Sequence, residues 1–145
     1  MTEFQKYFTT TAKGGYSNCI DRGSGSTIPN CVAWAWGWFF FDRRRTDMTK
    51  MRPRGDAKDI YNLCKPNGSG YWVSKDVKER AIACYNIGDK GHVVYVHYKL
   101  PNGQYLCSES NYSGTIGNGK YVRFLIGNPK ALYKNYQGCV YDFTK

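Results

Sequence analysis

The spacing of hydrophobic and polar positions divides the chain into a helical first half and a strand-rich second half. The longest apolar run covers residues 32–41, directly after a Gly/Ser-rich stretch and a Pro-Asn pair. An apolar run of this length behind such a loop predicts a buried helix from residue 31 to about residue 44. Residues 55–63 predict a second helix, which breaker residues end, and residues 4–12 predict a short one.

After residue 70, short runs rich in β-branched and aromatic residues alternate with turn residues, as is typical of strands. The predicted strands are residues 71–73, 81–85, 92–100, 104–111, 121–126 and 138–143. Helices followed by strands indicate the α+β class, here with N-terminal helices packed on a mostly antiparallel sheet of about five to six strands. The chain has 145 residues and no repeat or linker, so we expect one domain over residues 1–145.

One predicted hairpin fixes which side chains share a face of the sheet. Asn102 and Gly103 suit the centre of a two-residue type I′ turn, in which Pro101 faces Gln104 and the numbers of paired residues add up to 205. His92 then faces Ser113.

Because side chains alternate along a strand, this register places His92, Glu109 and Asn111 on one face of the hairpin. A one-residue bulge would separate them. His97 falls on the other face, so we expect it to be a surface or partner-paired histidine with no part in catalysis.

The net charge is +10 at pH 7, which indicates an anionic partner such as nucleic acid, an acidic membrane or a phosphate-rich cell wall. The first residues show no signal peptide, and the apolar run 32–41 is about half of what a bilayer needs. We therefore expect no membrane span.

Six cysteines are spread widely along the chain, at positions 19, 31, 64, 84, 107 and 139. With two histidines and no Cys-x-x-Cys pair, they do not indicate a zinc site, and no metal is predicted. Cys84 and Cys107 lie in predicted strands, where a cysteine is typically a small buried hydrophobe.

Cys31 differs from the other cysteines because it opens the apolar helix. The unpaired N–H groups and the dipole of a helix start favour a thiolate, which is the nucleophilic form of cysteine. A thiol hydrolase also needs a base and a group that orients the base. His92 fits the base, Glu109 fits the orienting group, and Asn111 could share or replace the role of Glu109.

An oxyanion that forms during such a reaction needs hydrogen-bond donors already in place. The backbone N–H of Cys31 is one candidate, and the side-chain amide of Asn30 is a second.

Four short motifs in this order resemble the CHAP family, the cysteine, histidine-dependent amidohydrolase/peptidase domains. They are Asn-Cys-Val-Ala-Trp at 30–34, Ala-Ile-Ala-Cys-Tyr at 81–85, Gly-His-Val-Val-Tyr-Val at 91–96 and Ser-Glu-Ser-Asn-Tyr at 108–112. Residues 14–37 resemble the versions found in bacteriophage lysins of Gram-positive hosts.

The resemblance implies a papain-like fold that cleaves an amide bond of peptidoglycan, either as an N-acetylmuramoyl-L-alanine amidase or as a stem or cross-bridge endopeptidase. It matches the nucleophile to Cys31, the base to His92 and the orienting pair to Glu109 and Asn111. Asn30 stands where the family commonly has Gln. Some relatives carry an acidic calcium loop, but here Asp21 stands alone, so no cofactor is expected.

A basic segment follows the predicted first helix and could bind anionic wall polymers, although a solvated helix end explains it equally well. Its members are Arg43, Arg44, Arg45, Lys50, Arg52 and Arg54. Binding of this kind would suit a chain in which no separate cell-wall-binding domain is visible.

These inferences predict a monomeric phage lysin that acts on Gram-positive peptidoglycan. It would be made in the host cytoplasm and either released by a holin or carried on the virion. The alternative is a non-catalytic, basic and aromatic-rich protein that binds polysaccharide or nucleic acid, which thirteen tyrosines would suit. No nucleic-acid motif accompanies them, so we expect no nucleic-acid partner.

Overall fold

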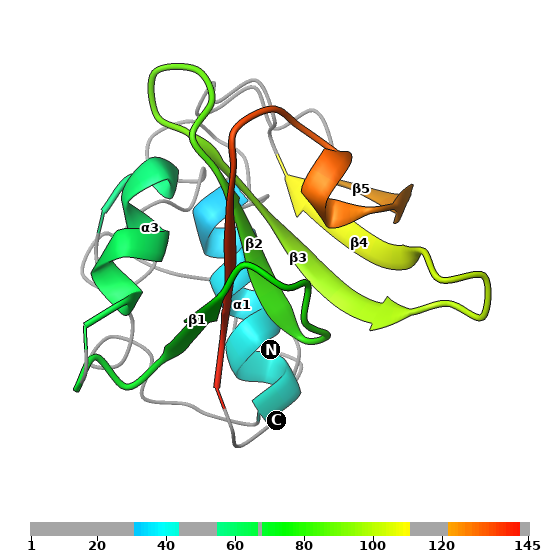
Figure 1. Cartoon of the computed structure of the whole chain (residues 1–145), viewed down its shortest axis with the longest axis horizontal. Helices are drawn as coiled ribbons and strands as arrows, with labels where there is room; N and C mark the ends of the chain where they lie inside the picture. The colour runs from blue at the N-terminus through cyan, green and yellow to red at the C-terminus, as the bar shows by residue number, and fades with distance from the viewer. Residues whose placement is uncertain (1–30, 44–54, 67, 111–121, 143–145) are drawn as a thin grey trace, which may run out of the picture.

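Six antiparallel strands form one sheet, and two helices pack on it (Figure 1). The computed structural model describes residues 31–43, 55–66, 68–110 and 122–142. The helices are α1 (Cys31–Arg43) and α3 (Ala57–Cys64). The strands are β1 (Trp72–Ser74), β2 (Ala81–Tyr85), β3 (His92–Lys99), β4 (Tyr105–Ser110), β5 (Val122–Gly127) and β6 (Tyr136–Tyr141).

The strand order is β1-β6-β2-β3-β4-β5, so the last strand enters the sheet between the first two. The predicted α+β class is confirmed, and all six predicted strands are present within two residues of their expected bounds. Both long helices are also confirmed. The helix predicted over residues 4–12 lies outside the described residues. Neither described helix is long and apolar enough to cross a membrane.

Helix α1 is apolar on nearly all sides because it lies in the core. It runs behind the sheet in Figure 1, where Ala35, Trp36, Phe39 and Phe40 are completely buried. The Trp36 and Phe40 rings stack with centroids 5.5 Å apart. Helix α3 adds Ile60 and other apolar side chains to the same core cluster. This cluster fixes the position of α1 against the middle of the sheet.

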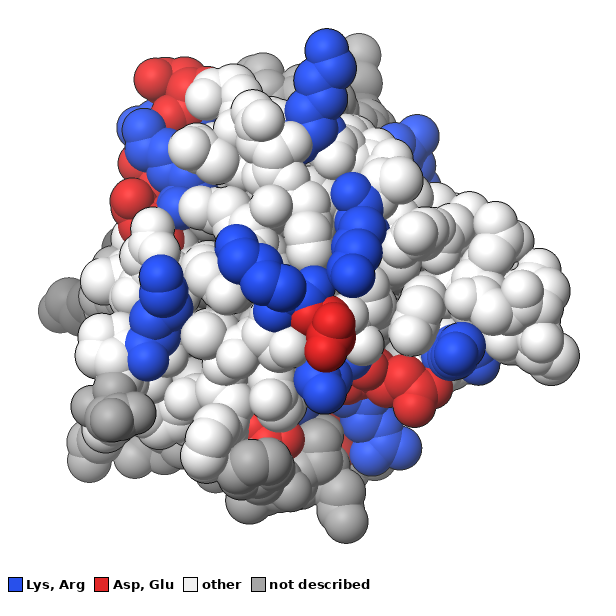
Figure 2. Space-filling model, in the orientation of Figure 1, with Lys and Arg blue, Asp and Glu red and all other residues white. Residues whose placement is uncertain are grey.

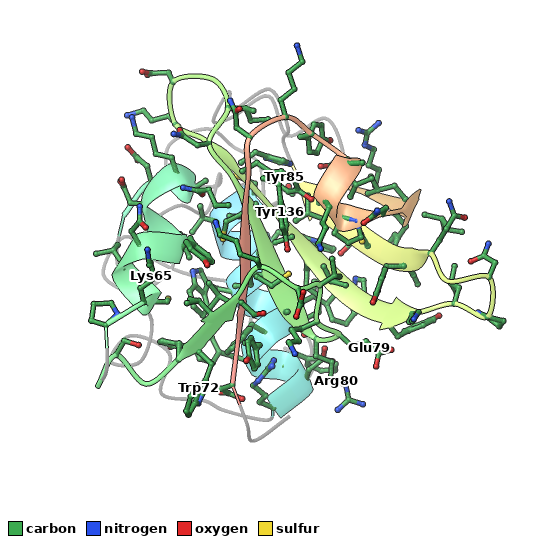
Figure 3. All side chains as sticks on the ribbon, in the orientation of Figure 1. Lys65, Trp72, Glu79, Arg80, Tyr85 and Tyr136 are labelled. Atoms are coloured by element: carbon green, nitrogen blue, oxygen red, sulfur yellow. The ribbon has the colours of Figure 1, made fainter. Side chains whose placement is uncertain are left out.

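A second buried cluster covers the opposite face of the sheet, where the 3-10 helix η2 (Pro129–Ala131) lies. Tyr85 and Tyr136, labelled in Figure 3, belong to this face, and their ring centroids are 5.7 Å apart. Cys107 is completely buried here and Cys84 is completely buried in the first cluster, which confirms the prediction for both. The described cysteines, which exclude Cys19, are free thiols.

The predicted two-residue turn between β3 and β4 is wrong. Leu100 N–H donates to the Gln104 carbonyl and Gly103 N–H donates to the Leu100 carbonyl, so three residues form the loop. Proline fixes φ near −65°, which suits the first central position of a type I turn, and Gly103 takes the left-handed position with φ +89°. A type I′ turn would require a positive φ at Asn102 as well.

Two irregularities in this hairpin cancel each other. The longer loop pairs Lys99 with Tyr105, so the pairing is shifted by one residue from the predicted register. A bulge between Val96 and Tyr98 then shifts it by one more, and Tyr95 pairs with Ser108. Two single-residue shifts restore the original alternation of faces. The prediction that His92 and Glu109 share a face is therefore confirmed, although its geometric basis was wrong.

Candidate active site

The start of α1, the start of β3 and the end of β4 lie at the same end of the sheet (Figure 1). Each of these ends carries one residue of the predicted catalytic set. Cys31 is the first residue of α1, His92 is the first residue of β3, and Glu109 is the last residue but one of β4. The tertiary structure thus gathers residues that are far apart in the sequence.

His92 and Glu109 form a buried pair. Nε2 of His92 lies 2.7 Å from Oε1 of Glu109, and the exposed fractions of the two side chains are 1% and 0%. A carboxylate in this position fixes the orientation of the imidazole and stabilises its protonated form.

Cys31 is the second neighbour that raises the pKa of His92. The three side chains therefore follow the order thiol, imidazole and carboxylate, and the hydrogen bond between His92 and Glu109 fixes the imidazole.

The pKa of His92 reflects its two neighbours, Cys31 and Glu109. Burial alone would lower the pKa, but the hydrogen bonds with Cys31 and Glu109 and their negative charges raise it from 6.5 to about 9. For Glu109, burial would raise the pKa, but hydrogen bonds from His92, Tyr133 and Arg123 and the charge of His92 lower it below 4.5. Near neutral pH, the pair is therefore an imidazolium and a carboxylate.

Two further residues hold Glu109, and the sequence alone did not indicate them. Arg123 Nε donates to Oε2 at 2.5 Å, and the Tyr133 hydroxyl lies 2.7 Å from both carboxylate oxygens. Arg123 pairs directly with Glu109 across β4 and β5. Its position depends on the register of these strands, in which Ser110 pairs with Val122. The Asn118-Gly119 dipeptide in the connecting segment is not centred on that register, so the sequence did not predict it.

The glycine before His92 is required by a close approach of two backbones. Gly91 has φ +77°, and a Cβ at this position would lie 2.4 Å from the backbone nitrogen of Lys58 in α3. The same Lys58 N–H donates to the Lys90 carbonyl at 3.0 Å. The start of β3 is thereby held against the first turn of α3, which fixes the point at which His92 enters the site.

His97 lies on the face of the sheet that carries α1, away from His92. Its Nε2 is 2.7 Å from Oγ of Ser108, which also accepts a hydrogen bond from Trp34 Nε1 at 2.9 Å. Burial lowers the pKa of His97 to about 4. The expectation of a partner-paired histidine is confirmed. A hollow of about 640 Å³ beside His97 is lined by Trp38, Phe124 and others, and its described lining does not include Cys31, His92 or Glu109.

Arg43 does not belong to an exposed basic segment. Its side chain is 1% exposed, and Nε forms an ion pair with Asp142 at 2.9 Å. The guanidinium also lies 3.6 Å from the centre of the Phe39 ring and donates to the Arg80 carbonyl. Arg43 therefore ties the end of α1 to the sheet, and its inclusion in a wall-binding patch is corrected.

Several predicted residues lie outside the described part of the chain. They are Asn30, Asn111, Asp21 and the other five members of the basic segment, Arg44, Arg45, Lys50, Arg52 and Arg54. Their roles remain predictions. Within the described residues, no group of three or more His, Cys, Asp or Glu is arranged to hold a metal ion.

Comparisons with known proteins agree with this geometry. A model of the CHAP domain family matches residues 21–111, which is more than half of the chain and includes Cys31, His92 and Glu109. No curated protein matches the chain. The solved structure described as the crystal structure of Ly7917 is similar in fold, with a TM-score of 0.51 and 14% sequence identity.

That similarity covers 98% of this chain but 60% of the Ly7917 chain. The α+β architecture and the likeness to this structure agree with a papain-like fold. The family implies hydrolase activity on peptidoglycan. The match over residues 21–111 shows that this chain belongs to the CHAP domain family.

Proposed function

We propose that this protein is a cysteine-dependent peptidoglycan hydrolase in which Cys31 is the nucleophile. The buried, hydrogen-bonded pair of His92 and Glu109, with Cys31 acting on the same imidazole, is the observation that carries this proposal. An imidazolium next to a thiol at a helix start favours the thiolate, and a buried carboxylate keeps the imidazolium in place.

The proposed reaction is acyl transfer in two steps. The Cys31 thiolate attacks an amide carbonyl, a C–S bond forms, and the leaving amine takes a proton from Nδ1 of His92. Water then attacks the thioester while His92 accepts its proton, and the thiol is released with a carboxylate product. The backbone N–H of Cys31 and the Asn30 amide are the proposed donors to the oxyanion.

Two classes of bond fit this chemistry. The enzyme would be an N-acetylmuramoyl-L-alanine amidase or an endopeptidase of the stem or cross-bridge. The resemblance of residues 14–37 to phage lysins supports a lysin of a phage of Gram-positive bacteria. In that case it is made in the host cytoplasm and reaches the wall with a holin or on the virion. We propose that it acts as a monomer, without cofactor or nucleic acid.

The first test compares clearing of Gram-positive cell walls by the wild type, Cys31→Ala and Cys84→Ala. Removing the nucleophile should slow clearing by at least about 10³-fold. Cys84 is completely buried in the core, so Cys84→Ala controls for the loss of a thiol. Clearing that survives in Cys31→Ala would refute the proposed nucleophile. Mass analysis of the released fragments would identify the bond.

Thiol labelling separates this proposal from the non-catalytic binding protein. Burial raises the pKa of Cys64 and Cys107 to about 12 and also raises the pKa of Cys84 and Cys139. The proposal therefore requires one thiol that is labelled rapidly, and this rapid labelling must disappear in Cys31→Ala. A binding protein would have no fast thiol.

A further inference from the structure

The carboxylate of Glu109 receives hydrogen bonds on both oxygens, from three different segments. His92 comes from β3, Arg123 from β5, and Tyr133 from the residues that follow η2. Glu109 itself is 0% exposed. A buried carboxylate without partners would take up a proton, and a protonated carboxyl could no longer stabilise an imidazolium.

We propose that Arg123 and Tyr133 are positioning residues that keep Glu109 ionised and directed at Nε2 of His92. The inference rests on the proposed function and extends it, because it assigns roles to two residues beyond the predicted catalytic set. Neither residue is proposed to touch the substrate.

The geometry of Arg123 fits this role. Arg123 is paired with Glu109 in the β4–β5 register, so its guanidinium lies beside the carboxylate of its direct neighbour. One nitrogen, Nε, donates to Glu109, and another, Nη2, donates to the Tyr133 hydroxyl at 3.0 Å. A lysine offers a point charge with no such planar arrangement of donors.

Tyr133 contacts both members of the buried pair. Its hydroxyl donates to Glu109, and its ring packs edge-on against the His92 ring with centroids 5.2 Å apart at 88°. The tyrosine therefore restricts rotation of the imidazole as well as orienting the carboxylate. Its hydroxyl links Arg123 and Glu109 into one network.

The charges in this network have a definite effect on pH dependence. Within the described residues, the titratable groups facing Glu109 are His92, Arg123 and Tyr133, with the Cys107 thiol acting on it from β4. Removing the Arg123 charge makes Glu109 easier to protonate and His92 harder to deprotonate. Both effects move the active pH range upward.

The test uses Arg123→Gln, Arg123→Lys and Tyr133→Phe in the full chain, with Lys134→Gln as a control. Lys134 is exposed and next to Tyr133, so its replacement removes the same single charge. Two rates are measured against pH, namely alkylation of Cys31 by iodoacetamide and cleavage of cell walls. A parallel Cys31→Ala sample supplies the background from other thiols.

We expect Arg123→Gln to move the acid limb of both profiles to higher pH and to slow cleavage about tenfold at low pH, the effect of one charge-assisted hydrogen bond. Tyr133→Phe should shift the profiles in the same direction, and Arg123→Lys, which keeps the charge but not the planar donors, should restore most of the pH shift but less of the rate. Lys134→Gln should match the wild type.

Profiles of Arg123→Gln and Tyr133→Phe that coincide with the wild type would overturn the inference, as would an equal shift in Lys134→Gln. If Arg123→Gln unfolds, Tyr133→Phe decides, because a wild-type pH profile and rate in that variant would contradict a positioning role. The alkylation profile does not require wall cleavage. A chain that shifts in alkylation but cleaves no wall would refute the proposed function and retain the positioning role.

Discussion

At the scale of single residues, the site depends on two buried ionisable side chains that offset each other's cost of burial. An unpaired charge in this environment would be strongly unfavourable, and each partner supplies the other's counter-charge. His92 and Glu109 are both almost fully buried and lie 2.7 Å apart. The pair is therefore part of the folded core as well as of the proposed reaction centre.

This pairing predicts how stability changes with pH. The pKa of His92 rises from 6.5 to about 9 on folding, so the stabilisation from its protonated form is fully present below pH 6.5. It is lost as the pH rises through about 9. Urea unfolding between pH 6 and 10 should show the advantage of the wild type over His92→Gln shrinking across this range. A constant difference would contradict the pairing.

His92, Glu109 and Cys31 could be proposed from the sequence because their residue types and local settings suit the chemistry. Arg123 and Tyr133 could not. An arginine in a strand and a tyrosine in a loop have no local feature that distinguishes them from surface residues. Only the pairing of β4 with β5 and the position of η2 bring them to Glu109.

At the scale of elements, the hairpin of β3 and β4 shows how a correct result can follow from an incorrect local assignment. Pro101 favours a type I turn over the predicted type I′ turn, and the bulge at His97 then restores the alternation. The buried face of each strand explains this compensation. A register that moved Glu109 and Cys107 to the other face would remove both from their buried partners.

The contact between β3 and α3 gives a second test at this scale. Gly91→Ala should destabilise the fold by roughly 2–5 kcal/mol, because the left-handed backbone is strained and the new Cβ would meet the Lys58 backbone. A displacement of His92 by about 1 Å would slow wall cleavage about 10²-fold.

Gly88 supplies a matched control for this substitution. It also has a positive φ, +63°, but a Cβ there would meet no atom within 4 Å. Gly88→Ala should cost about 1 kcal/mol and leave cleavage unchanged. Thermal and urea unfolding of both variants measure the difference. Equal losses of stability would show that the contact with α3 does not position His92.

At the scale of the whole molecule, the position of β6 joins distant parts of the chain. It lies between β1 and β2, and Asp142 immediately after it forms the buried ion pair with Arg43 at the end of α1. The end of α1 is thus attached to the last described strand. Arg43 therefore anchors the end of α1 through this ion pair, a role that the charge pattern alone did not indicate.

The charge of the whole molecule bears on its attachment to the wall. Lys and Arg side chains are spread over the face shown in Figure 2 and do not form one patch there. Residues 44–54, which follow Arg43, contain five basic residues. We propose that these five residues bind anionic wall polymers.

Reversing Arg44, Arg45 and Arg52 to Glu should weaken wall association about tenfold or more at low salt, with little effect at high salt, because exposed charges are screened. A cosedimentation assay measures the association. Reversal of Lys99, Lys130 and Lys134, which are exposed elsewhere, changes the net charge equally and should have a smaller effect. Equal losses would assign binding to the overall charge and not to residues 44–54.

The sequence by itself determined the elements and the chemistry of the site. Apolar spacing, turn residues and the placement of Cys31 at a helix start are local properties, and each is fixed by a few neighbouring residues. The tertiary structure decided the hairpin register, the Arg123 and Tyr133 contacts to Glu109, and the burial of Arg43. These depend on pairing and packing between segments distant in the chain, where the free energy of burying charged groups selects the partners.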